Sequence, residues 1–146
     1  MTRINVVPPE WLCDQHLLAE YRELTRIPNA VAGDKYSMDG QPADYKLGAG
    51  HVKFFLDKLA YLKRRYDALA AELKARGFKA EDRWPSDVGM LDGRWNDYAP
   101  TQEAMLANVE RIAKRMPELC RFHGKRMSRA QAVEQLVGRL RDTQPA

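Results

Sequence analysis

Residues 52–77 read VKFFLDKLAYLKRRYDALAAELKARG and carry the clearest periodic pattern in the chain. Apolar side chains recur there in alternating steps of three and four residues, at Val52, Phe55, Leu59, Leu62, Tyr66, Leu69 and Leu73. This spacing places them on one face of a helix. Gly77 follows Lys74 and Arg76, which suits the carboxyl end of a helix. The stretch therefore predicts one long amphipathic helix ending at Gly77.

The composition around this stretch also favours helix. The chain has 146 residues, a length typical of one domain, and contains 18 Ala and 15 Leu against 8 Val and 3 Ile. The longest run without a charged residue, 27–33, has seven residues, whereas a membrane-spanning helix needs about 20. We expect a mainly α, compact single-domain fold without a membrane span, and a β-sandwich or barrel is disfavoured.

Charge and cysteine content bear on partners and location. The net charge of +4 and the pI near 9.1 give mild support for a polyanionic partner. Two cysteines without a Cys-x-x-Cys spacing favour free thiols. The first residues lack the basic and apolar segments of a secretory signal, so we expect a cytoplasmic protein.

Three further helices are predicted. The first spans 10–27 and is ended by Pro28. The second spans 101–116 and is ended by Pro117, and its periodicity turns Asn108, Arg111 and Arg115 outward. The third starts at Ser128, where SRAQ has the form of a capping box. The segments 29–46 and 78–100 are rich in turn residues and predict irregular structure, with the tryptophans of the second packing over the helices.

The helix expected over 10–27 has a polar side with several chemically active groups. These are Gln15, His16, Arg22, Glu23 and Arg26. Such a run, taken alone, is typical of a solvated face. No His-Glu-x-x-His or Cys/His cluster supplies closely spaced metal ligands, so we expect no metal site. Gly48-Ala49-Gly50 opens a helix but lacks the other residues of a nucleotide-binding loop, and it fits a close-packed or phosphate-facing helix start.

Several blocks resemble one family over about residues 2–125. They are TRIN (2–5), DQHL (14–17), AEYREL-x-R (19–26), LGAGHV-x-FF-x-DKL (47–59), RGF (76–78), DY-x-P (97–100) and GK (124–125). In this order they resemble the phage-type pyrimidine-dimer DNA glycosylases. The resemblance implies a glycosylase-like domain over 1–125, with residues 126–146 as a C-terminal extension with a short helix. It also implies that the N-terminal segment is threaded between the helices.

The same resemblance implies a function and its residues. It predicts a DNA repair glycosylase with abasic-site lyase activity on cyclobutane pyrimidine dimers in double-stranded DNA. The α-amine of Thr2, exposed by removal of Met1, would be the nucleophile, and Glu23 the catalytic carboxylate. The expected DNA contacts are Arg3, Gln15, His16, Arg22, Arg26, Arg121 and Lys125. No metal or organic cofactor is implied, and we expect a monomer.

The sequence departs from the phage pattern before Gly124. An aromatic-rich segment is replaced by Leu-Cys-Arg-Phe-His, which keeps only Phe122. Because aromatic rings help to read unstacked bases, this replacement bears directly on the lesion preference. Two alternatives therefore stay open: the same lyase chemistry on an oxidised base, a ring-opened base or an abasic site, or a helical nucleic-acid-binding protein without catalysis.

Overall fold

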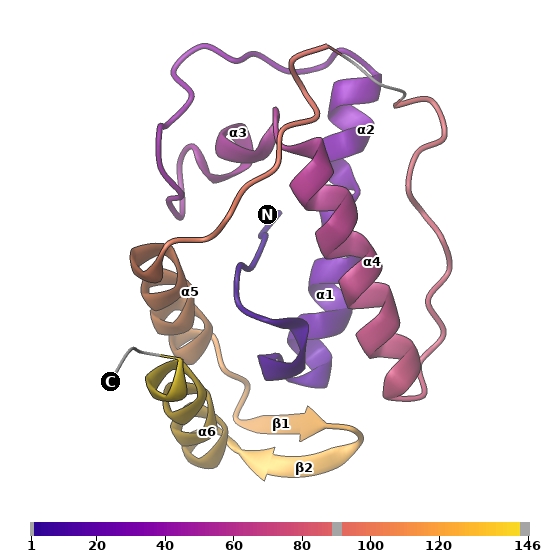
Figure 1. Ribbon diagram of the computed structural model, residues 1–146. Helices are drawn as coiled ribbons and strands as arrows, with labels where there is room; N and C mark the ends of the chain where they lie inside the picture. Colours follow the sequence, from indigo (N-terminus) through magenta and orange to yellow (C-terminus); the bar gives the residue numbers. More distant parts are fainter. Residues whose placement is uncertain (1, 89–91, 144–146) are drawn as a thin grey trace.

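The computed structural model describes residues 2–88 and 92–143 and shows a mainly helical fold (Figure 1). The elements in chain order are the 3-10 helix η1 (Pro9–Trp11), α1 (Asp14–Leu24), α2 (Arg26–Ala32), α3 (His51–Phe55), α4 (Leu59–Ala75), α5 (Gln102–Lys114), β1 (Leu119–Phe122), β2 (Lys125–Ser128) and α6 (Arg129–Asp142). Helix α1 packs on α4, α5 packs on α6, and the two strands form a hairpin against α1. The predicted fold class is confirmed.

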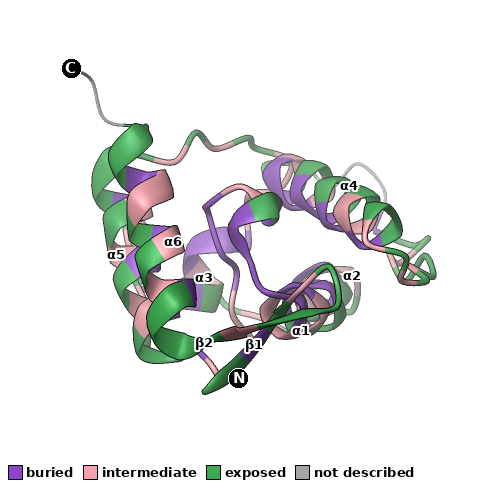
Figure 2. Ribbon diagram, turned by 90° about the horizontal axis from the view of Figure 1, so that it is seen from below, coloured by how far each residue is buried: buried purple, intermediate pink, exposed green. Residues whose placement is uncertain are grey.

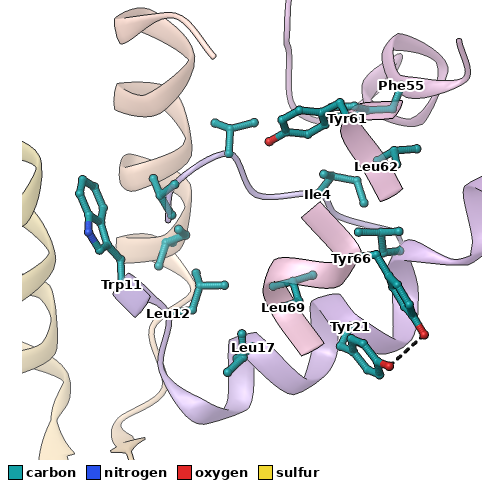
Figure 3. Close-up of a cluster of buried hydrophobic side chains, with 14 of the residues drawn as sticks. Ile4, Trp11, Leu12, Leu17, Tyr21, Phe55, Tyr61, Leu62, Tyr66 and Leu69 are labelled. Carbon is teal, nitrogen blue, oxygen red and sulfur yellow. Dashed lines mark hydrogen bonds between the residues drawn. The ribbon is translucent and has the colours of Figure 1, made fainter. Parts of the chain in front are cut away.

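The N-terminal segment, residues 2–8, runs through the middle of the molecule. Figure 1 shows it between the α1 and α4 pair and α5, and Figure 2 shows its buried backbone enclosed by helices whose outer faces are exposed. The residues from Ile4 to Val7 are all buried. In Figure 3, Ile4 and Leu12 lie in the same apolar cluster as Leu62 and Leu69 of α4. The predicted threading of this segment is thus confirmed.

The periodic stretch 52–77 is two helices, and the prediction of one continuous helix was wrong. Its apolar positions from Phe55 to Leu73 are buried as expected. The helix breaks at residues 56–58 because the backbone there pairs with another segment: Leu59 N donates to Arg94 O at 2.9 Å, and Asn96 N donates to Asp57 O at 3.1 Å. These contacts compete with helical hydrogen bonds, and a periodic pattern cannot reveal them.

The first predicted helix also differs from its prediction. Pro28 does not end it; the chain turns at Thr25, and Pro28 is the third residue of α2. Proline is tolerated there because the amide of a first-turn residue has no partner within the helix. At the other end, Pro9 lies in η1, and α1 starts only at Asp14.

The C-terminal part adds a hairpin that the sequence did not predict. The loop residues His123 and Gly124 have φ of 52° and 78°, the left-handed values of a two-residue type I′ turn. Helix α6 follows with the predicted capping box between Ser128 and Gln131. The expected start of the extension at residue 126 falls within β2, and α6 adds Ala132, Leu136 and Leu140 to the core. Among the described residues, no helix is long and apolar enough to cross a membrane.

Candidate active site

A buried hydrogen-bond network holds the N-terminal segment in place. Asn5 Nδ2 donates to Glu20 Oε1 at 2.8 Å, and Arg65 of α4 donates to both carboxylate oxygens of Glu20 at 2.8 and 2.9 Å. Arg65 also donates to the carbonyl of Val7. Burial of a carboxylate is costly unless its oxygens have hydrogen-bond partners. The bonds to Asn5 and Arg65 therefore allow Glu20 to be buried, with 2% of its surface exposed. The network joins α1 and α4 to the segment.

Asn108 joins the third helix, α5, to the same segment. Its Oδ1 accepts from Val6 N at 2.8 Å and Val7 N at 3.3 Å, and its Nδ2 donates to Asn5 Oδ1 at 2.8 Å. Asn108 is fully buried, so its predicted outward orientation was wrong. The N-terminal segment is extended but has no neighbouring strand among the described residues. The Asn108 side chain provides the hydrogen-bond partners that such a strand would provide.

His51 and Tyr45 hold the segment at Ile4, two residues after Thr2. Ile4 N donates to His51 Nε2 at 2.8 Å, His51 Nδ1 lies 2.8 Å from Lys46 O, and the Tyr45 hydroxyl donates to Ile4 O. Burial lowers the pKa of His51, since the charged ring is poorly solvated there. The neutral ring therefore donates from Nδ1 and accepts at Nε2. The last residue of Gly48-Ala49-Gly50-His51 therefore holds the N-terminal segment by a hydrogen bond from Ile4 N.

The clamped segment ends beside a small hollow. This hollow, of about 40 Å³, is lined by Arg3, Asn5, His16, Ala19, Glu20, Glu23 and Ile112. It brings together three predicted site residues, Arg3, His16 and Glu23. Thr2 precedes Arg3, and Arg26 Nη1 lies 3.5 Å from Thr2 Oγ1, a long contact at the hydrogen-bond limit. Arg3 and Glu23 therefore share the hollow, and Thr2 lies next to it beside Arg26.

The electrostatics of the hollow are dominated by arginines. Burial lowers the pKa of Arg3, the positive charges of Arg111 and Arg115 lower it further, and Glu23 opposes this effect. Arg111 and Arg115 were expected to face outward, and Arg115 is exposed while Arg111 is half-buried. Both lie near enough to Arg3 to act on its charge, and they were missed as site residues. Their only sequence signal was that two arginines share one polar face of α5. Glu20 is already paired with Arg65, so among the described residues the arginines face one carboxylate without such a partner, Glu23, and their excess positive charge favours binding of a polyanion.

His16 is held between α1 and the end of α5. Its Nε2 lies 3.2 Å from Arg115 O, and burial lowers the pKa of the ring. A neutral ring that donates from Nε2 leaves Nδ1 as an acceptor. Nδ1 is buried and has no hydrogen-bond partner within residues 2–88 and 92–143. An acceptor without a partner is uncommon among buried polar groups.

The other predicted DNA contacts lie outside the hollow. Arg22 is exposed near the end of α1, and Arg121 and Lys125 are exposed on the hairpin. Gln15 is engaged with the protein itself: its Nε2 donates to Leu119 O at 2.8 Å, and its Oε1 accepts from Arg121 N at 3.1 Å. Gln15 therefore covers the free edge of β1 and couples the hairpin to α1.

In the part of the chain that the structure describes, no group of three or more His, Cys, Asp or Glu is placed to hold a metal ion.

Comparison with protein families identifies a family for the chain. The family model described as pyrimidine dimer DNA glycosylase matches residues 1–86. This range contains the N-terminal segment, Glu20, Glu23, His51 and Arg65. Because the match spans more than half of the chain, we conclude that the protein is a DNA repair glycosylase and belongs to the pyrimidine dimer DNA glycosylase family.

Proposed function

We propose that the protein removes cyclobutane pyrimidine dimers from double-stranded DNA by combined glycosylase and abasic-site lyase chemistry. The observation that carries this proposal is the hollow of Arg3, His16 and Glu23 at the end of a rigidly held N-terminal segment. Such a segment fixes the position of the residue that becomes the N-terminus when Met1 is removed. Holding a nucleophile in position lowers the entropy cost of its reaction.

The α-amine of Thr2 is the nucleophile in this proposal. An α-amine has an ordinary pKa of about 7.7 to 8.0, against about 10.4 for Lys, so a useful fraction is neutral at physiological pH. Its nitrogen attacks C1′ of the 5′ sugar of the dimer, and the bond from C1′ to the base breaks; the base leaves with the bonding electrons and takes a proton from water. The nitrogen then passes one proton through Glu23 to O4′ as the sugar ring opens, which leaves a protonated imine. The imine acidifies the C2′ proton, and its removal expels the 3′ phosphate.

Glu23 serves as the charged partner of this reaction. Its carboxylate stabilises the positive charge that develops on the sugar and takes up a proton during imine formation. Arg22, near the end of α1, and Arg26, the first residue of α2, bind phosphates on either side of the attacked sugar. This chemistry requires neither a metal nor an organic cofactor, and one copy of the chain suffices for it.

Covalent trapping tests the nucleophile. Borohydride added during turnover on dimer-containing duplex should reduce the imine and leave DNA attached to Thr2, as identified by peptide mass spectrometry. Acetylation of the Thr2 amine should abolish trapping while leaving most of the DNA binding. Attachment at a lysine, or no attachment, would remove Thr2 from the mechanism.

Substitution of Glu23 tests the carboxylate. Glu23→Gln removes the charge with little change of shape, so the glycosylase step should slow by at least about 100-fold. Glu110→Gln is a matched control, because Glu110 is exposed on α5 and lies outside the hollow. A rate for Glu23→Gln within a few-fold of this control would make Glu23 a surface carboxylate.

One observation favours a second substrate range for the same chemistry. Phe122, the one ring retained from the aromatic segment of the phage pattern, is half-buried and lies 5.9 Å from the Arg76 guanidinium. A ring used for packing is less free to stack on a base. Duplexes with a dimer, an oxidised base or an abasic site, compared at one enzyme concentration, distinguish the two ranges. Binding to all of them without cleavage would favour the non-catalytic alternative.

A further inference from the structure

The outer face of the hairpin presents two arginines directly opposite each other. In the register of β1 and β2, Arg121 pairs with Arg126, and both are exposed. The neighbouring pair, Cys120 with Met127, lies on the inner face, where Cys120 is fully buried. Because side chains alternate along a strand, both guanidinium groups emerge on the solvent side of the hairpin.

The local geometry brings these two arginines close. Arg121 N donates to Gln15 and not to β2, so Arg121 and Arg126 form a non-hydrogen-bonded pair. In such pairs the Cα atoms are about 4.5 Å apart and the side chains approach more closely than in hydrogen-bonded pairs. Like charges at directly opposite positions destabilise a hairpin. Within the described residues, neither guanidinium has a hydrogen bond or ion pair that would offset this repulsion.

The two arginines also share a hollow with α1. This hollow has a volume of about 360 Å³ and is lined by Arg121, Arg126, Gln15, Leu18 and Phe78, among others. Its one carboxylate, Asp14, is already engaged by Arg76 at 2.9 Å and by the backbone amides of His123 and Gly124. The two guanidinium groups therefore set the charge of the hollow, and it suits an anion.

The hairpin is fixed to the helix that carries the candidate catalytic carboxylate. Asp14 and Gln15, in the first turn of α1, hold the turn and the free edge of β1, respectively. Glu23 lies more than two turns further along the same helix, at a rise of about 1.5 Å per residue. A DNA duplex bound over α1 would therefore meet the hairpin at a fixed distance from the lesion.

We propose that Arg121 and Arg126 jointly bind one phosphate of the DNA backbone, at a site on the hairpin separate from the hollow of Glu23. This proposal rests on the proposed function in taking DNA as the partner and in placing the lesion at Glu23. A phosphodiester oxygen between two guanidinium groups would turn their repulsion into two charge-assisted hydrogen bonds. The hairpin would then add affinity for the duplex flanking the lesion without entering the chemistry.

The test is the salt dependence of binding to an undamaged, fluorescently labelled duplex. We compare the full chain with Arg121→Gln, Arg126→Gln and the double variant. The double variant should lower the magnitude of the slope of log K against log salt by about 0.9, the value for one phosphate contact. Its affinity deficit should therefore shrink about 3.5-fold when salt rises fourfold. Arg139→Gln with Arg141→Gln, on α6, is the control with the same change in net charge.

Three results would overturn the proposal. An unchanged salt slope in the double variant would leave both arginines as solvated side chains. An equal decrease of the slope in the α6 control would reduce the effect to net charge. A decrease equivalent to about two phosphate contacts would mean that the arginines bind two separate phosphates. The thermal midpoint of the free double variant should not fall, because relief of the repulsion stabilises the hairpin. Since binding to undamaged DNA requires no catalysis, failure of the Thr2 mechanism and failure of this site are distinguishable.

Discussion

Replacement of Asn108 tests whether the buried network positions the N-terminal segment. Asn108→Leu keeps the approximate volume but leaves Val6 N–H, Val7 N–H and Asn5 Oδ1 without their partner. A buried polar group without a partner costs about 1 to 3 kcal/mol, so the two groups with 2.8 Å bonds alone predict a loss of about 2 to 6 kcal/mol in the free energy of unfolding. This is a large part of the about 5 to 15 kcal/mol that stabilises a typical domain.

Urea unfolding measures this loss, and single-turnover cleavage measures its effect on the site. Val109→Ala is a suitable comparison, because Val109 is buried on the same helix and its truncation removes apolar contacts but no hydrogen bond to the segment. At a temperature where both variants are folded, Asn108→Leu should lose cleavage and borohydride trapping while Val109→Ala keeps them. A free energy of unfolding within about 1 kcal/mol of wild type, or equal cleavage by the two variants, would refute the positioning role.

Three further measurements follow from the structure. Because burial lowers the pKa of His51 below its ordinary 6.5, the unfolded chain binds a proton that the folded chain does not, and stability should fall as pH drops below about 6.5. One such group changes the free energy of unfolding by at most about 1.4 kcal/mol per pH unit. Urea unfolding of His51→Gln at several pH values should show a flatter pH dependence of this free energy. An equally steep dependence would assign the effect to other groups. Arg22→Ala and Arg26→Ala should each weaken binding to damaged and undamaged duplex and reduce the salt slope by about 0.9, whereas an unchanged slope would make them solvated side chains. Phe122→Ala should impair dimer cleavage more than abasic-site cleavage, and equal losses would assign the ring to packing.

The candidate site was partly visible in the sequence because its residues lie close together along one helix. The spacing of His16 and Glu23 on α1 follows from helical geometry, and the resemblance supplied Thr2 and Arg3. Arg111 and Arg115 were missed as site residues because they come from α5. Their proximity to Arg3 depends on how α5 packs across the N-terminal segment, and no local pattern encodes that distance.

The sequence by itself determined the helical class, the apolar faces, the capping box at Ser128 and the blocks that define the family. These features depend on neighbours within a few residues, where backbone geometry fixes which side chains meet. The tertiary structure alone decided the break at residues 56–58, the inward turn of Asn108 and the attachment of the hairpin to α1. Each depends on hydrogen bonds between distant segments, such as Asn108 to Val6 and Gln15 to Leu119. A buried backbone amide must find a partner, and which distant side chain provides it is settled only when the helices pack.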